Sequence, residues 1–177
     1  MTDFPEFRDH SSISKDLEAT LDELKDRERL TFFNVELSDF PYYFTEFGHE
    51  QADIVVNRVL QFMHKMSTRE HINYCAGLVT EDYDTNFMGF TEEPKFLEAN
   101  ILRAVNSESY HCVAAKGERE VSFGEKKLKL DPQKVSAVVG AVSFKPGQRA
   151  LAEIMELAEK AKEEAKISGS NFKIYDL

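Results

Sequence analysis

The sequence predicts an α/β protein in which helices flank a mixed central β-sheet, with one additional β-hairpin. Short apolar, β-rich runs alternate with amphipathic segments in the order helix, strand, helix, strand, strand, helix, hairpin, strand, helix, strand. The 177 residues include 42% hydrophobic and 31% charged side chains, which is typical of a globular chain. No repeat, low-complexity tract or linker divides it, so we expect an arm over 1–13 and a single domain over 14–177.

The first half of the chain is expected to supply two helices and three strands. Residues 14–29 repeat leucines at helical spacing, and Ser14 is a candidate N-cap. The run Leu-Thr-Phe-Phe-Asn-Val-Glu-Leu at 30–37 is short, apolar and β-rich, which predicts a buried central strand. The remaining elements expected in this half are a helix over 53–66 and strands over 72–78 and 87–90.

The second half is expected to begin with a short helix over 96–105 and a hairpin within 110–130, where Gly117 and Gly124 separate β-like runs. A strand over 135–144, a long helix over 147–167 closed by Gly169, and a last strand over 172–175 follow. The Glu/Lys-rich residues 159–166 predict a solvated helix face.

Charge and glycine content exclude several function classes. The net charge of −10, from 32 acidic and 22 basic side chains, argues against a nucleic-acid duplex as partner, although a mononucleotide held through a metal ion remains compatible. The 8 glycines stand singly, so no Gly-rich phosphate loop can be written. The apolar runs are too short to span a membrane and the N-terminus has no signal-peptide pattern, so we expect a cytoplasmic protein.

An ordered series of motifs extends from Leu30 to Tyr175. The strand at 30–37 leads into Ser38-Asp39-Phe40, and Gly48-His49 and Ala52-Asp53 pairs follow. The run 135–141 reads Val-Ser-Ala-Val-Val-Gly-Ala, and the C-terminal region carries Ala158-Glu159, Ala161, Ala165-Lys166, Gly169 and Asn171. In this order and spacing the motifs resemble the GGDEF family of diguanylate cyclases, whose closing pattern is Ala-Asp…Ala-Leu-Tyr…Ala-Lys…Gly-x-Asn.

The resemblance implies a palm-like nucleotidyl-cyclase fold that binds GTP and joins two GTP molecules into cyclic di-GMP through two Mg²⁺ ions. By the same resemblance, the first metal-binding Asp corresponds to Glu36 and the second to Ser38. The phosphate-binding Lys corresponds to Pro41, which supplies no cation, and the guanine-binding Asn corresponds to Phe44.

Two nucleotide-binding positions of the resembled family are kept, and another is lost. Asp53 corresponds to the second guanine contact, and Lys166 retains the basic residue of the closing pattern. The basic residue four positions later corresponds to Ser170. We therefore treat Asp53, Lys166 and Phe44 as vestigial nucleotide-binding positions.

The signature hairpin can be aligned in two registers. Residues 79–83 place Glu81 and Asp82 at the acidic positions, whereas residues 83–87 place Thr85 at the metal-binding position. Neither register contains the two glycines that let backbone approach a nucleotide, and neither is preceded by the family's Arg-x-x-Asp inhibitory motif. Glu36, Glu81 and Asp82 are thus vestigial catalytic positions.

Each candidate site has a structural interpretation beside the functional one. Glu36 and Glu81 form either a surviving Mg²⁺ site or a pair of solvated carboxylates. Asp53 contacts a base or only stabilises a helix start. Four aromatic residues after the first strand form either an interaction patch or a filled pocket: Phe40, Tyr42, Tyr43 and Phe44.

The function expected from these observations is that of a degenerate, catalytically inactive GGDEF domain. It would act as a regulatory or protein-interaction module in bacterial signalling, with a protein partner or a flanking signalling domain. No cofactor is required, and Mg²⁺ is expected only with a bound nucleotide. The alternatives are a metal-dependent nucleotide-binding enzyme of altered chemistry that uses Glu36, Glu81 or Asp82, and a unit of an oligomeric assembly without a ligand.

Overall fold

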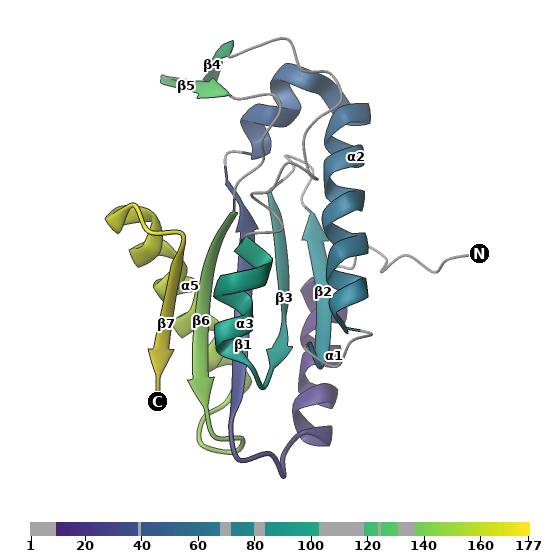
Figure 1. The fold of residues 1–177 in the computed structure, drawn as a ribbon, viewed down its shortest axis with the longest axis vertical. Helices are drawn as coiled ribbons and strands as arrows, with labels where there is room; N and C mark the ends of the chain where they lie inside the picture. The colour runs from purple at the N-terminus through teal and green to yellow at the C-terminus, as the bar shows by residue number, and fades with distance from the viewer. Residues whose placement is uncertain are drawn as a thin grey trace, which may run out of the picture.

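The computed structural model describes residues 10–38, 40–67, 72–79, 84–102, 119–123, 125–130 and 137–177 (Figure 1). A five-stranded sheet has the order β2-β3-β1-β6-β7, and a separate two-stranded sheet pairs β4 with β5. The strands of the large sheet are β1 (Leu30–Leu37), β2 (Tyr74–Val79), β3 (Thr85–Thr91), β6 (Ala137–Phe144) and β7 (Phe172–Asp176). The hairpin consists of β4 (Arg119–Phe123) and β5 (Lys126–Leu130). The mixed α/β architecture with its additional hairpin is confirmed.

The strand β1 lies at the centre of the large sheet. It pairs antiparallel with β3 on one side and with β6 on the other, and β6 pairs parallel with β7. Near the end of β1, Glu36 lies opposite Asn86 of β3 and Val138 of β6. A side chain at this strand end therefore has a neighbouring strand on each side.

Helices cover both faces of the large sheet (Figure 1). One face carries α2 (Phe40–Ser67), the short α3 (Pro94–Phe96) and the π-helical turn η1 (Leu97–Leu102). The opposite face carries α1 (His10–Glu23) and α5 (Leu151–Ser168). Because side chains alternate along a strand, Phe33, Val35 and Leu37 of β1 join the core under α2, whereas Leu30 and Phe32 join the core under α1 and α5.

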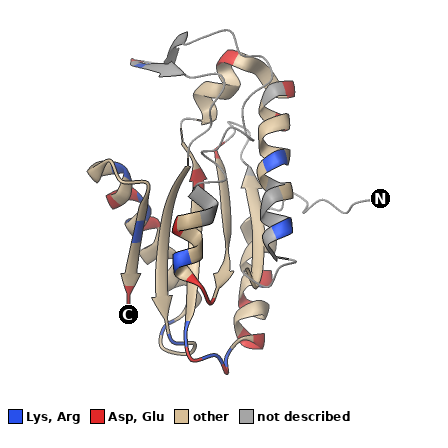
Figure 2. Ribbon diagram, viewed as in Figure 1, with Lys and Arg blue, Asp and Glu red and all other residues tan. Residues whose placement is uncertain are grey.

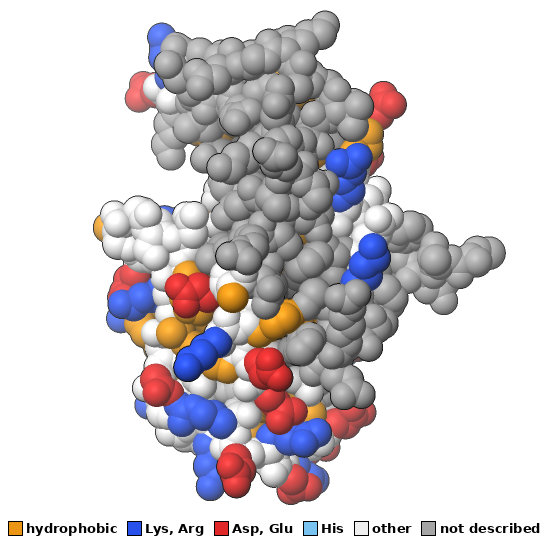
Figure 3. All heavy atoms as spheres, in the orientation of Figure 1, with side chains coloured by type: hydrophobic (Ala, Val, Ile, Leu, Met, Phe, Trp, Pro, Cys, Tyr) orange, Lys and Arg blue, Asp and Glu red, His pale blue; other side chains and the backbone are white. Residues whose placement is uncertain are grey.

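Charged residues are concentrated outside the central strands (Figure 2). β2, β3 and β6 contain none, and β1 contains only Glu36. On the described part of the face shown in Figure 3, acidic and basic side chains are interspersed. Within the described ranges, no helix combines the length and the apolar character needed to cross a lipid bilayer.

The first helix begins earlier than expected. α1 starts at His10, so residues 10–13, assigned above to the arm, are helical, and Ile13 is buried. The hydroxyl of Ser14 donates to the carbonyl oxygen of His10, 2.9 Å away. The prediction of Ser14 as N-cap is wrong, because this residue lies inside the helix.

The second helix also extends further than expected. α2 begins at Phe40, thirteen positions before the predicted start at 53, and its helical geometry is interrupted at Gly48 (φ 79°). Glycine tolerates this left-handed φ at little steric cost, which lets the chain bend there. Phe40, Tyr43, Phe44 and Phe47 recur at helical spacing before the bend, so the signal for a helix was present in the sequence.

Candidate functional site

A group of charged side chains gathers where the end of β1 faces α5. We call it the ion-pair cluster, and it consists of Glu36, Glu159, Lys162, Glu163 and Lys166. Lys166 Nζ lies 2.8 Å from Glu36 Oε1 and 2.7 Å from Glu163 Oε1. It also donates to Glu36 Oε2 at 2.9 Å. Both oxygens of the Glu36 carboxylate therefore contact ammonium groups.

Lys162 is the buried member of the ion-pair cluster, with only 2% of its surface exposed. Its Nζ lies 2.9 Å from Glu36 Oε2, 2.8 Å from Glu159 Oε2 and 3.0 Å from Asn86 Oδ1. An ammonium group has three hydrogens to donate, so three acceptors satisfy it completely. Because a buried charge is tolerated only when it is paired and hydrogen-bonded, these contacts explain how the fold accommodates the buried Lys162 side chain.

Close packing between α5 and β6 places Lys162 over Glu36. A Cβ at Gly140 of β6 would lie 2.1 Å from the carbonyl oxygen of Ala158 and 2.5 Å from the backbone nitrogen of Lys162. Only glycine allows this approach of helix backbone to strand. The buried alanines at 158, 161 and 165 keep the helix close to the sheet along the same stripe.

The lysines change the proton affinity of the glutamate. Burial by itself would raise the pKa of the Glu36 carboxyl, but hydrogen bonds and positive charge from Lys166 and Lys162 outweigh it, and the pKa is lowered. Burial would lower the pKa of Lys166, but its contacts with Glu163 and Glu36 raise it. Glu36 and Lys166 are therefore both charged near neutral pH.

The carboxylates of the ion-pair cluster are close enough to share one cation. Glu36, Glu159 and Glu163 each offer an oxygen within 4.8 Å of the other two. Carboxylates suit Mg²⁺, but two ammonium groups already bind these three residues, and Ser38 offers a hydroxyl where the resembled family has a second acidic ligand. The described residues therefore do not fit a Mg²⁺ ion.

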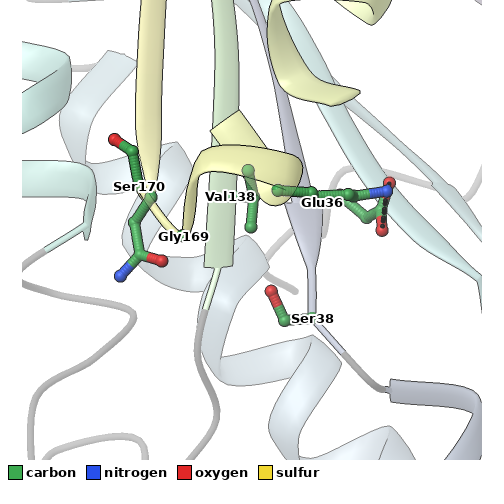
Figure 4. Close-up of a pocket in the computed structure, with 7 residues that line it drawn as sticks. Glu36, Ser38, Val138, Gly169 and Ser170 are labelled. Atoms are coloured by element: carbon green, nitrogen blue, oxygen red, sulfur yellow. Dashed lines mark hydrogen bonds and ion pairs between the residues drawn. The ribbon is translucent and has the colours of Figure 1, made fainter. Parts of the chain in front are cut away.

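An open pocket of about 400 Å³ lies beside the cluster (Figure 4). It opens between the C-terminal end of β1, the start of β6 and the turn from α5 to β7. The dashed lines in Figure 4 end on Glu36. Its described lining residues are Glu36, Ser38, Val138, Lys166, Gly169, Ser170 and Asn171. Of the three vestigial nucleotide-binding positions, only Lys166 is among these described lining residues.

The aromatic residues after β1 are distributed between core and surface. Phe40 and Tyr43, in the first turn of α2, are buried with their ring centroids 5.8 Å apart and stacked, so they belong to the core and offer no surface to a partner. Phe44 is half-buried, with its ring 4.5 Å from the ring of His49, and Tyr42 is half-buried. We call the four residues Phe40, Tyr42, Tyr43 and Phe44 the aromatic cluster; only Tyr42 and Phe44 are within reach of a partner.

The other predicted site residues are placed apart from the ion-pair cluster or not described. Asp53 is exposed on α2, five residues beyond the bend at Gly48. Glu81 and Asp82 lie outside the described residues, so the pairing of Glu36 with Glu81 stays a prediction. In the second register, the metal-binding position is Thr85, which is buried on the side of Phe87 and α2, whereas Asn86 lies opposite Glu36.

Sequence reasoning missed the residues that complete the cluster. The prediction that 159–166 is a solvated face is wrong at Lys162, which shares the buried stripe of α5 with Ile154, Ala158 and Ala165. A lysine at helical spacing within an apolar stripe was the available signal. Asn34 and Asn86 were also missed: Asn34 donates to Glu159 at 3.0 Å, and Asn86 accepts from Lys162.

Comparison with known proteins identifies the fold. The active GGEEF domain of a diguanylate cyclase from Vibrio cholerae aligns with a TM-score of 0.66 and 18% identity, over 96% of this chain and 98% of that one. The GGDEF domain of DgcB from Caulobacter crescentus, in complex with c-di-GMP, gives 0.63 and 13%, over 98% and 90%.

The diguanylate cyclase SiaD from Pseudomonas aeruginosa, in complex with its activator SiaC, gives a TM-score of 0.64 and 14% identity. That alignment covers 99% of this chain and 60% of SiaD. No protein-family model and no curated protein matches the sequence. The likeness to solved structures shows that the chain has a GGDEF-like fold, as the sequence resemblance predicted.

Proposed function

From a GGDEF-like fold with altered site residues, we propose a catalytically inactive domain that serves as a regulatory or protein-interaction module in bacterial cyclic-dinucleotide signalling. The observation that carries the proposal is the pairing of Glu36, whose two carboxylate oxygens bind Lys162 and Lys166. A carboxylate held in this way is a poor ligand for the metal ions that phosphoryl transfer requires.

The substitutions around Glu36 support the same proposal. Ser38 replaces an acidic ligand, Pro41 replaces the phosphate-binding cation, and Phe44 replaces the guanine-binding amide that the resemblance implies. Positioning and charge neutralisation supply most of the catalysis in phosphoryl transfer, so the combined loss removes the main sources of rate.

We propose that such a domain acts by binding a protein partner. SiaD, one of the structures that share this fold, is in complex with an activator protein. In this chain the half-buried rings of Tyr42 and Phe44 come shortly after Glu36 in sequence, and aromatic rings are common anchors in protein interfaces. We place this interaction in the cytoplasm, with no resident cofactor and with either a separate partner or a flanking signalling domain.

The loss of cyclase activity is tested by incubating the protein with GTP and Mg²⁺ or Mn²⁺. We expect no cyclic di-GMP by chromatography and mass spectrometry, while an active GGDEF domain assayed in parallel forms product. Metal-dependent product from this chain would refute the proposal.

The interaction role is tested by comparing capture from native lysate with the wild-type protein, Tyr42→Ala and Lys160→Ala, an exposed change on α5. We expect one protein to be retained by the wild type and Lys160→Ala and lost with Tyr42→Ala. Identical capture by all three would show that the aromatic surface is not used.

The open pocket favours one second candidate, a nucleotide-binding enzyme of altered chemistry. Its volume of about 400 Å³ and the polar groups of Lys166, Ser170 and Asn171 could hold part of a nucleotide. A thermal-shift and turnover screen with ATP, GTP and cyclic dinucleotides, repeated with Glu36→Ala, tests it. Stabilisation by a nucleotide that depends on metal and on Glu36 would favour this candidate.

A further inference from the structure

The carboxylates of Glu36 at the end of β1 and of Glu159 and Glu163 on α5 are arranged as a cation site, and lysine ammonium groups contact all three. Oxygens of Glu36, Glu159 and Glu163 lie within 4.8 Å of one another, which is the spacing of ligands around a single ion. Lys162 Nζ contacts the carboxylates of Glu36 and Glu159 at 2.8–2.9 Å. Among the contacts described for it, no other acidic side chain pairs with Lys162. Its third hydrogen bond goes to the neutral oxygen of Asn86.

We propose that the Lys162 ammonium takes the place of a divalent metal ion, so that the folded domain carries its own cation at Glu36 and binds no Mg²⁺ there. This inference rests on the proposed loss of cyclase chemistry and adds a cause for it. A metal ion at Glu36 would have to share its ligand with a buried positive charge that is enclosed by the fold, and like charges in such a site repel strongly.

The position of Lys162 on α5 explains why this residue takes the place of the metal ion. In the closing pattern that this helix resembles, Ala161 is followed by leucine, and this chain has Lys162 there. The backbone of α5 is fixed against β6 by the close approach at Gly140, so a long side chain at 162 is directed into the sheet interface. A leucine at this position ends in methyl groups and leaves Glu36 without its buried cation.

Lys166 does not provide the same function. It is one-third exposed and also binds the exposed Glu163, so it can move towards solvent when another cation approaches. Lys162, with its side chain 3% exposed, has no such route. Removal of Lys162 alone is therefore expected to open the site.

The test uses Mn²⁺ as a probe, with binding followed by the electron paramagnetic resonance signal of the free ion. The variants are Lys162→Leu and Lys162→Met, and the matched control is Lys160→Leu, which removes the same charge from the exposed face of α5. We expect the two Lys162 variants to bind Mn²⁺ at least about tenfold more tightly than the wild type and the control. Adding Glu36→Gln to Lys162→Leu should abolish the gain.

Folded Lys162 variants, as judged by circular dichroism, that bind Mn²⁺ no more tightly than the control would overturn the inference. A second measurement needs no Lys162 variant. The thermal midpoint of the wild-type protein should be the same in MgCl₂ as in NaCl of equal ionic strength, and a Mg²⁺ stabilisation that Glu36→Gln removes would also overturn it. Neither outcome depends on cyclic di-GMP formation, so the inference can fail while the proposed loss of activity stands.

Discussion

Near the end of β1, the two faces of the sheet are packed with different kinds of side chain. On the α5 side, five charged residues form the ion-pair cluster around Glu36. On the α2 side, the rings of Phe40 and Tyr43 stack in the apolar core. Ion pairs depend on pH and on each partner being present, whereas ring packing depends on volume. The same region is therefore closed by two physically different means, and substitutions on each side can separate them.

The largest effect is expected on the aromatic side. Phe40→Ala removes a fully buried ring and leaves a cavity, so the free energy of unfolding should fall by about 3–5 kcal/mol in urea denaturation. The loss should be the same at pH 5 and pH 8. Tyr42→Ala, at a half-buried position, should cost less than about 1 kcal/mol. Equal losses of unfolding free energy from the two variants would mean that the buried ring of Phe40 contributes no more to stability than the half-buried ring of Tyr42.

A smaller effect is expected when the buried cation is removed. Lys162→Met keeps much of the side-chain volume but removes the donor shared by Glu36, Glu159 and Asn86, so stability should fall by about 1–3 kcal/mol at pH 7. Lys160→Met on the exposed face should change stability by less than about 0.5 kcal/mol. A Lys162→Met variant as stable as this control would contradict the geometry of the cluster.

The pH dependence distinguishes the ion-pair cluster from the aromatic cluster. The folded-state pKa of Glu36 is lowered, so its contribution to stability is full above the ordinary value of 4.5 and is lost as the pH falls through the folded-state pKa. The pKa of Lys166 is raised, so its contribution is full below 10.5 and is lost as the pH rises further. The stability gap between wild type and Glu36→Gln should be constant from about pH 6 to 9 and close in acid. A gap that widens in acid would contradict this assignment.

The smallest effect is expected at Asn34. Its Nδ2 donates to Glu159, but its buried Oδ1 has no hydrogen-bond partner among the described residues. Asn34→Leu loses one hydrogen bond and removes one unsatisfied acceptor, so stability should change by less than about 1 kcal/mol. Asn34→Asp, which places a carboxylate beside Glu159, should be clearly destabilising. A large loss with leucine would show that Oδ1 is satisfied in solution.

Most of the fold could be predicted from the sequence, because the residue patterns that indicate strands are local. Residues 30–37 combine β-branched and aromatic side chains in one short run, and β1 has these bounds. The start of α2 was not predicted, although the rings from Phe40 to Phe47 recur at helical spacing. The local pattern in residues 40–47 is therefore sufficient to predict this helical turn.

The site was less predictable, because it depends on contacts between distant segments. Glu36 and Lys166 were chosen from the family resemblance, whereas Lys162 was assigned to solvent with the charged residues around it. Its burial follows from the approach of α5 to β6 at Gly140, and its partner Asn86 belongs to a strand far away in sequence. The helical spacing of Lys162 with Ala158 and Ala165 indicates the face it shares, but it does not show which residues of the sheet it contacts.

The most direct test of the account is to observe the Lys162 ammonium in the wild-type protein by nitrogen-15 side-chain NMR, with Lys162→Met for assignment. A buried ammonium with three acceptors should exchange its protons slowly and give a resolved signal at neutral pH. The account predicts that the signal keeps its position and width when Mn²⁺ is added. Broadening of this signal by stoichiometric Mn²⁺ would place a metal ion beside Lys162, within the ion-pair cluster, and contradict the account.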